Sequence, residues 1–395
     1  MTAISYDCTR KVLVTQASTR NSFVLTYALG KMGVPMQCAD TEHYPLSRFS
    51  RFCRGFSTYP SPHTDPDGYF AAINTIIDRE KIALLFPAYD EMIFLAQNRH
   101  RLDRPEVLLA PPGEHVAMLH KKTELYRLCG QIGCNAPQTM ELAEEADVER
   151  VLERMSFPLV IKPERGGGGW GVSYVNSAET LRQQWQAFDV EKHRNRLFVQ
   201  QYVKGPLFGY GVLCDQGKIL ASNCYHTVRQ HPIGKGTPSF RRGCVVEEIE
   251  RQVETICSHL GWTGVCQYDF LQDEQEGMTY CIDANPRFWG SLAQGLASGV
   301  NFPFLAYLLG TGQHDGTVMR RTGVDVTSCW LWGDLLVLLA RLRKEQGKGS
   351  IIREHLSAWA TAYFDDMRSD DPLPFFFYPL QKLLAARRAD QAGGF

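Results

Sequence analysis

The sequence predicts a protein of mixed α/β and α+β type that is divided into two or three domains. The chain has 395 residues, which is more than a single hydrophobic core usually organises. Residues 11–40 have the pattern of a β-α-β unit, whereas residues 158–283 contain short apolar strands separated by glycine-containing turns. The last part, from about residue 322 to 395, reads as two or three helices.

The first domain is expected to be Rossmann-like. Residues 11–15 read as an apolar strand, residues 20–31 have helical spacing, and residues 34–40 read as a second strand. The turn at residues 15–19 lacks the G-x-G-x-x-G that a dinucleotide requires. We therefore expect a Rossmann-like form that need not bind a cofactor.

Two further elements carry charged residues at their ends. The strand at residues 82–87 is followed by Asp90 and Glu91, at the sheet edge where doubly wound folds bind ligands. Both acids would equally suit a helix N-terminus, so the two roles stay open. Lys122 begins an amphipathic helix that ends near Gly133, and a lysine there is usually only a solvated helix residue.

A glycine-rich loop lies between two predicted strands. The first strand, residues 158–163, carries Lys162 inside an apolar run, where lysine is rarely found without a partner. The loop matches G-x-G-x-x-G by letter, but it leads into a strand at residues 172–175 and not into a helix. We expect a hairpin that folds over phosphate groups with Lys162; the alternative is a flexible surface hairpin. The candidate loop residues are Gly166, Gly167, Gly168 and Gly169.

The next segments are an apolar strand at residues 197–203 and a hairpin with strands at residues 210–213 and 218–221. From residue 226 the sequence reads as a loop rich in glycine and cations, which suits the anionic groups of a substrate. Arg229 and Ser239 are the candidate substrate residues there, together with Arg287.

The strongest pattern in the chain is Asp283-Ala284-Asn285-Pro286-Arg287. Asp283 and Asn285 lie two residues apart in a predicted strand, so both side chains point to the same side. The strand at residues 264–270 places Asp269 beside them, and oxygen ligands of this kind suit Mg²⁺ or Mn²⁺. Arg287 adds a cation that can hold a carboxylate or phosphoryl group in a fork. The alternative is a strand that ends in an Asn-Pro turn with a surface salt bridge.

Bulk properties exclude several classes of function. The net charge of −1 disfavours binding to nucleic acid, and no apolar run is long enough to span a bilayer. The N-terminus lacks a signal-peptide pattern, and the twelve cysteines include no Cys-x-x-Cys. We therefore expect reduced core cysteines, a cytoplasmic protein and small-molecule partners.

In combination, Val160-Ile161-Lys162-Pro163, the glycine loop, Gln200-Gln201-Tyr202-Val203 and the Asp283–Arg287 pattern resemble the ATP-grasp superfamily. The branch that they resemble contains the carbamoyl-phosphate synthase large subunit and biotin carboxylase. The resemblance spans about residues 122–309, roughly half the chain. It implies a pre-ATP-grasp Rossmann-like domain over residues 1–115 and an ATP-grasp domain over 116–320, with lobes at about 120–205 and 206–320. A helical region over 321–395 completes the chain.

The same resemblance implies roles for individual residues. Lys122, Lys162 and the loop glycines would hold the phosphates of ATP, and the backbone at Gln201 to Val203, after Gln200, would hold adenine. Asp269, Asp283 and Asn285 would bind Mg²⁺, and Arg287 would act in catalysis with Lys162. The chain departs from the family pattern at Asp269 and Asp283, where the family usually has glutamate, and at Gln201 and Leu207, where an acid is common. These departures put ribose recognition and tight ATP affinity in doubt.

The resemblance implies a carboxylate–amine ligase that forms an amide through an acyl phosphate and releases ADP and phosphate. Two rivals stay open: phosphorylation of bicarbonate or carbamate, and a nucleotide-binding regulatory protein without catalysis. The C-terminal region, with an apolar proline-bounded turn expected at residues 372–379, could cover the site, form a homodimer contact or cap the core.

Overall fold

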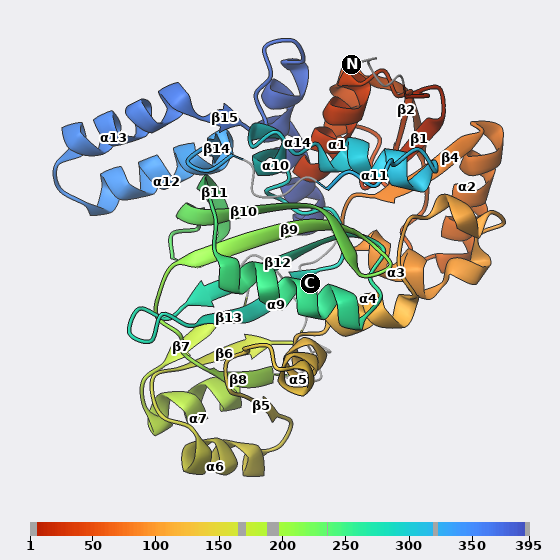
Figure 1. Ribbon diagram of the computed structural model, residues 1–395. Helices are drawn as coiled ribbons and strands as arrows, with labels where there is room; N and C mark the ends of the chain where they lie inside the picture. Colours follow the sequence, from red (N-terminus) through yellow and green to blue (C-terminus); the bar gives the residue numbers. More distant parts are fainter. Residues whose placement is uncertain (1–5, 165–170, 188–196, 235, 319–322, 392–395) are drawn as a thin grey trace.

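The structure, a computed structural model, describes residues 6–164, 171–187, 197–234, 236–318 and 323–391. In these residues the chain forms three β-sheets surrounded by helices (Figure 1). The mixed α/β composition that the sequence predicts is confirmed.

The first sheet has the order β3-β2-β1-β4, and all its strands are parallel. The strands predicted at residues 11–15 and 82–87 and the helix at 20–31 lie where the sequence places them. Helix α1 begins where the Thr19 hydroxyl accepts a hydrogen bond from the Ser22 amide, a regular N-cap. The elements are β1 Lys11–Thr15, α1 Arg20–Lys31, β2 Met36–Asp40, η1 Leu46–Phe49, β3 Cys53–Thr58, α2 Pro66–Arg79, β4 Ile82–Pro87, α3 Glu91–Gln97, η2 Arg99–Arg101, η3 Pro105–Val107 and α4 Gly113–His120.

The second sheet is antiparallel, with the order β5-β8-β6-β7. Strands β6 and β7 pair directly, which confirms the predicted hairpin. The four loop glycines at 166–169 lie outside the described residues, so their predicted contact with phosphate stays a prediction. The elements are α5 Lys122–Ile132, β5 Thr139–Leu142, α6 Glu145–Arg154, β6 Leu159–Pro163, β7 Ser173–Val175, α7 Ala178–Ala187 and β8 Leu197–Gln201.

The third sheet has seven strands in the order β13-β12-β9-β10-β11-β14-β15. The predicted loop from residue 226 is wrong in its first half, because β10 continues to His231 and pairs with β11. In this pairing the backbone groups of residues 226–231 find partners in β11, although the segment that they begin has the glycine and cation content of a loop. The elements are β9 Leu207–Asp215, β10 Lys218–His231, β11 Thr237–Cys244, α9 Glu247–His259, β12 Gly264–Gln272, β13 Thr279–Asn285, β14 Thr327–Cys329 and β15 Tyr363–Phe364.

The C-terminal region contributes both helices and two strands of the large sheet. The turn predicted at residues 372–379 is wrong, because this segment begins helix α14. Pro374 fits in the first turn of that helix, where the backbone N–H has no intrahelical partner to lose. Figure 1 shows α12 and α13 extending away from the molecule while α14 passes beside α1. The helices are α10 Ala293–Ala297, α11 Phe302–Gly310, α12 Leu331–Lys344, α13 Lys348–Thr361 and α14 Leu373–Gln391.

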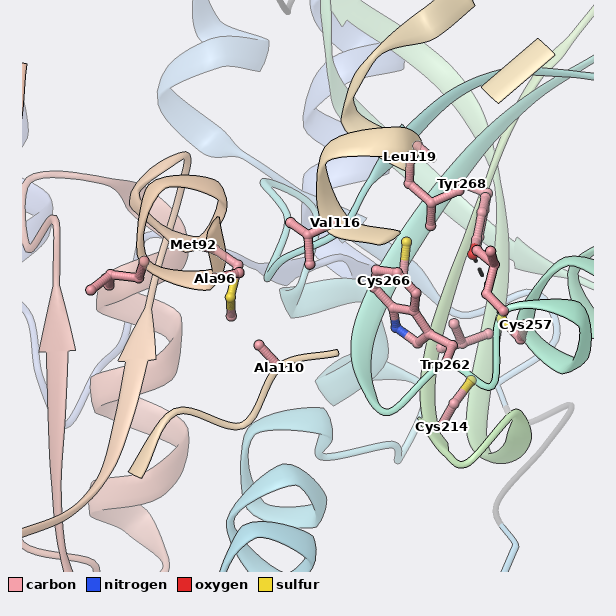
Figure 2. Packing of buried hydrophobic residues seen from close by; sticks show 14 of the residues in the cluster. Met92, Ala96, Ala110, Val116, Leu119, Cys214, Cys257, Trp262, Cys266 and Tyr268 are labelled. Atoms are coloured by element: carbon pink, nitrogen blue, oxygen red, sulfur yellow. Dashed lines mark hydrogen bonds between the residues drawn. The ribbon is translucent and has the colours of Figure 1, made fainter. Parts of the chain in front are cut away.

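A shared hydrophobic core joins the first sheet to the large sheet. Figure 2 shows side chains of α3 and α4, such as Met92 and Val116, on one side of this core, with Trp262 and Cys266 on the other. All twelve cysteines are free thiols, and nine of them are buried, as expected of core residues. In the described part of the chain, no helix is long and apolar enough to cross a membrane.

Candidate active site

A cavity of about 1250 Å³ lies where the three sheets and the C-terminal helices meet. Its wall includes nearly all the predicted site residues that the structure describes. These are Lys122, Lys162, Gln200, Gln201, Tyr202, Val203, Arg229, Asp269, Asp283, Asn285 and Arg287. Lys122 and Arg287, 165 positions apart in sequence, therefore share one cavity, as a single ligand site requires.

Asp269 and Asp283 face each other across two neighbouring strands. They are directly opposed partners in the antiparallel pair of β12 and β13, and Asn285 lies two residues further along β13. The side chain of Gln267 connects the group: its Nε2 donates to Asp269 Oδ1 at 2.6 Å, and its Oε1 accepts from Asn285 Nδ2 at 2.8 Å. The Asn285 side-chain oxygen accepts no hydrogen bond from any described residue. Two carboxylates and an amide oxygen are a donor set that fits Mg²⁺.

The charges of this group are unbalanced without a cation. Burial, and after it the negative charge of Asp283, together raise the pKa of Asp269 to about 7. Lys122 Nζ lies 3.7 Å from Asp283 Oδ1 and partly offsets the negative charge. Two acids held this close under partial burial favour a bound cation over mutual repulsion.

Lys162 projects from β6 toward the same carboxylates. Its ammonium group donates to Gln200 Oε1 at 2.6 Å. Burial lowers the pKa of Lys162 to about 8; Asp283 acts in the opposite direction, and the nearby Lys122 lowers it again. Because its acceptor is neutral, this buried ammonium group favours the binding of an anionic ligand such as a phosphate.

In the segment after β8, which the resemblance assigns to adenine, two backbone amides already donate hydrogen bonds within the protein. The amide of Gln201 donates to Gln138 O at 2.8 Å, and that of Tyr202 to Pro158 O at 3.3 Å. The Val203 amide has no acceptor within the described residues, and Val203 lines the cavity. The Gln201 side chain also donates to Pro158 O, at 3.2 Å.

Arg287 is buried with 7% of its surface exposed, and its guanidinium is held from two sides. Its Nε donates to Asp90 Oδ1 at 2.9 Å, and its plane lies 4.0 Å from the centre of the Tyr89 ring. The two acids that follow β4 therefore have different partners. Asp90 holds Arg287, whereas Glu91 lies in the interior and accepts from Tyr59 and Tyr69.

Arg229 and Ser239, the other substrate candidates, share one internal partner. Arg229 donates from Nε and Nη2 to the two oxygens of Asp334, at 2.9 and 2.7 Å, and lines the cavity. Ser239 is fully buried and donates to Asp334 Oδ1 at 2.9 Å. This places Ser239 behind the cavity wall rather than on it.

The sequence reasoning missed several residues of this cavity. Arg20 and Asn21 come from the N-terminus of α1, and Trp330, Tyr378 and Lys382 come from the C-terminal region. No local pattern marks them, because they reach the cavity only through tertiary packing. Of the three roles considered for the C-terminal region, covering the site agrees with this lining.

The part of the chain that carries most of this site is similar to known proteins. Residues 122–301 match the family model described as carbamoyl-phosphate synthase L chain, ATP binding domain. A D-alanine–D-alanine ligase of Pseudomonas putida is 27% identical over 189 residues, which cover 43% of this chain and 55% of the relative. A carbamoyl-phosphate synthase of Methanobrevibacter smithii is 24% identical over 179 residues, or 44% of this chain and 47% of the relative. The chain thus spans about half the length of these curated relatives.

Solved structures show the same fold over a longer range. The biotin carboxylase domain of 2-oxoglutarate carboxylase from Hydrogenobacter thermophilus gives a TM-score of 0.66 at 17% identity, and covers 82% of this chain and 75% of that one. L-amino acid ligase from Bacillus licheniformis gives 0.60 at 18% identity, covering 79% and 78%. Residues 122–301 therefore resemble the ATP binding domain of the carbamoyl-phosphate synthase L chain, and over a longer range the chain shares the fold of these solved structures.

Proposed function

We propose that this protein is an ATP-dependent carboxylate–amine ligase. ATP phosphorylates a carboxylate to an acyl phosphate, an amine attacks the acyl carbon, and the products are an amide, ADP and phosphate. One observation carries the proposal: a single cavity brings together two lysines, two opposed carboxylates with an amide, and a buried arginine. The relatives support it, since the matched proteins include D-alanine–D-alanine ligases and the fold is shared with an L-amino acid ligase.

The residues divide the work between binding and charge stabilisation. Lys122 and Lys162 hold phosphate oxygens of ATP, and the Val203 amide is placed for the adenine ring. Asp269, Asp283 and Asn285 would hold Mg²⁺, which would neutralise charge on the phosphates when bound. This chemistry needs no nucleophilic side chain, because phosphoryl transfer to a positioned carboxylate depends mainly on orientation and electrostatics.

Arg287 is assigned to the reacting group. Asp90 and Tyr89 fix its guanidinium from two sides, so its remaining donors point in a defined direction. A rigid fork of this kind stabilises the charge that develops on a transferring phosphoryl group. The carbonyl of Phe288 takes one further hydrogen bond, at 3.1 Å from Nη1, which leaves Nη2 for the substrate.

The test is ADP formation with a panel of carboxylic acids and amines in the presence of Mg²⁺. We expect ADP only when both an acid and an amine are present, since the amine is needed to complete the turnover. A bicarbonate arm tests the second candidate, which the match to the carbamoyl-phosphate synthase ATP binding domain favours. ADP formation with bicarbonate and not with carboxylic acids would support that candidate. MgATP binding without ADP formation in any arm would favour a regulatory protein.

A further inference from the structure

The guanidinium of Arg20 lies at the end of the cavity that Trp330 and Tyr378 of the C-terminal region line. Its side chain has only 12% of its surface exposed and lines the cavity. Its plane lies 3.8 Å from the centre of the Trp330 ring, which fixes its orientation. Its Nη1 atom is buried without a hydrogen-bond partner, and none of its donors makes a hydrogen bond to a described residue. A nearly buried guanidinium in this state carries a large desolvation cost that a ligand can offset.

The nearest acid does not supply the missing acceptor. Asp365 lies 3.5 Å from Arg20 Nη1, but both its oxygens accept from Arg241, at 2.5 and 2.6 Å. Asp365 therefore serves two buried arginines, and Asp366 is a second acid that acts on Arg20. Lys382, from α14, lines the cavity and acts on Arg20 as well, so three cations face two acids at this end.

The segment that follows the catalytic Arg287 is shaped to leave room beside Arg20. A Cβ atom at Gly290 would lie 3.5 Å from Arg20 Nη2, so the missing side chain keeps the space next to this nitrogen open. Asn21 fastens the start of α1 to the same segment, because its amide donates to Phe288 O at 3.2 Å. Gly290 is three residues from Arg287, so their Cα atoms are at most about 11 Å apart. Arg20 and Arg287 are thus within reach of the two ends of one small molecule or of two adjacent ones.

From this geometry we infer that Arg20 binds a second anionic group of the substrates, a carboxylate distinct from the one that is phosphorylated. This inference rests on the proposed ligase function and narrows its substrate class. Either the amine is an amino acid whose own carboxylate binds Arg20, or the acid is a dicarboxylate whose remote carboxylate does so. In both cases a planar carboxylate meets the guanidinium fork in two parallel hydrogen bonds.

The test uses the acid–amine pair that gives the fastest ADP formation with the wild type. Each partner in turn is replaced by its carboxamide, which removes one charge with little change in size. We expect amidation of the second carboxylate to raise the KM of the wild type by about 10- to 100-fold, the range for a charge-assisted hydrogen bond. The effect of amidating the carboxylate of the amino acid, compared with that of amidating the remote carboxylate of the dicarboxylic acid, distinguishes the two sources.

Arg20→Gln should erase this discrimination, and Arg20→Lys should restore part of it. The matched control is Lys31→Gln, which removes an exposed cation from the other end of α1 and should leave the KM ratio unchanged. Melting temperatures show whether each variant is folded. Arg20→Gln with the wild-type preference for the carboxylate would overturn the inference.

If no acid–amine pair forms ADP, the ligase proposal is wrong. The Arg20 subsite is then tested separately, by ligand binding. The probes are the common amino acids and short dicarboxylates with their carboxamides, each added to the protein with ADP and Mg²⁺. A rise in melting temperature with the free acids but not the carboxamides, lost in Arg20→Gln, would support the subsite. Equal shifts in wild type and Arg20→Gln, or no shift with any probe, would overturn it.

Discussion

Replacing Lys162 with methionine is expected to stabilise the ligand-free protein while it weakens nucleotide binding. Lys162 is an ammonium group held in a partly buried position by one neutral partner, Gln200. Residues placed for binding often reduce stability, because the ligand and not the protein satisfies their charge. Methionine has a similar length and apolar stem, so it should fill the same space.

The structure gives the size of the effect. Burial lowers the pKa of Lys162 from 10.5 to about 8, which at about 1.4 kcal/mol per pKa unit means that the charged form costs about 3 kcal/mol in the folded state. Methionine removes that cost but leaves the Gln200 oxygen without its donor, a loss of about 1–2 kcal/mol. We therefore expect Lys162→Met to be more stable by about 1–2 kcal/mol near pH 7.

The pH dependence follows from the same values. Below pH 8 Lys162 is charged in both the folded and the unfolded state, so its cost is present in full; above pH 10.5 it is neutral in both and the cost is absent. The advantage of the methionine variant should therefore shrink between pH 8 and 10.5. The assay is urea unfolding without nucleotide at several pH values, beside equilibrium binding of MgADP. A methionine variant that is less stable at pH 7 and binds MgADP normally would refute the reasoning and make Lys162 structural.

Three further predictions concern charged residues in the cavity wall or directly behind it. Asp283→Asn removes the charge that faces Asp269, so ADP formation should fall by about 100-fold or more while ATP affinity falls less, measured by steady-state kinetics beside equilibrium binding. Arg287→Lys keeps a charge but loses the fork, so turnover should fall while ATP stays bound; a lowered ATP affinity at unchanged turnover would contradict this role. Asp334→Ala leaves Arg229 buried without its acceptor and should destabilise the protein by about 3–5 kcal/mol in urea unfolding. An Asp334→Ala change below about 1 kcal/mol would show that water replaces the carboxylate.

The sequence predicted the parts of this molecule that depend on local patterns. Alternating apolar residues located β12 and β13, and the spacing of Asp269 and Asp283 was sufficient to place them on neighbouring strands. The hairpin of β6 and β7 followed from an apolar strand, a glycine run and a second strand. These elements owe their form to residues close together in the chain.

The sequence did not predict the parts that depend on packing between distant segments. Residues 226–231 look like a loop, yet pairing with β11 makes them a strand. Pro374 and Pro379 suggest a turn, yet the aromatic residues between them pack on the first domain, where Phe377 stacks on Phe49 at 3.7 Å. The contact of Asp90 with Arg287 joins residues 197 positions apart, and no local pattern encodes it.

The transfer of oxygen from the acid substrate to phosphate tests the central claim most directly. The acid is labelled with ¹⁸O in its carboxylate, and the inorganic phosphate released during ADP formation is analysed by mass spectrometry. A carboxylate oxygen attacks the γ-phosphorus of ATP and displaces ADP. The amine then attacks the acyl carbon and displaces phosphate, so each phosphate carries one labelled oxygen. Our account predicts one ¹⁸O per phosphate, and ADP formation with unlabelled phosphate would contradict it.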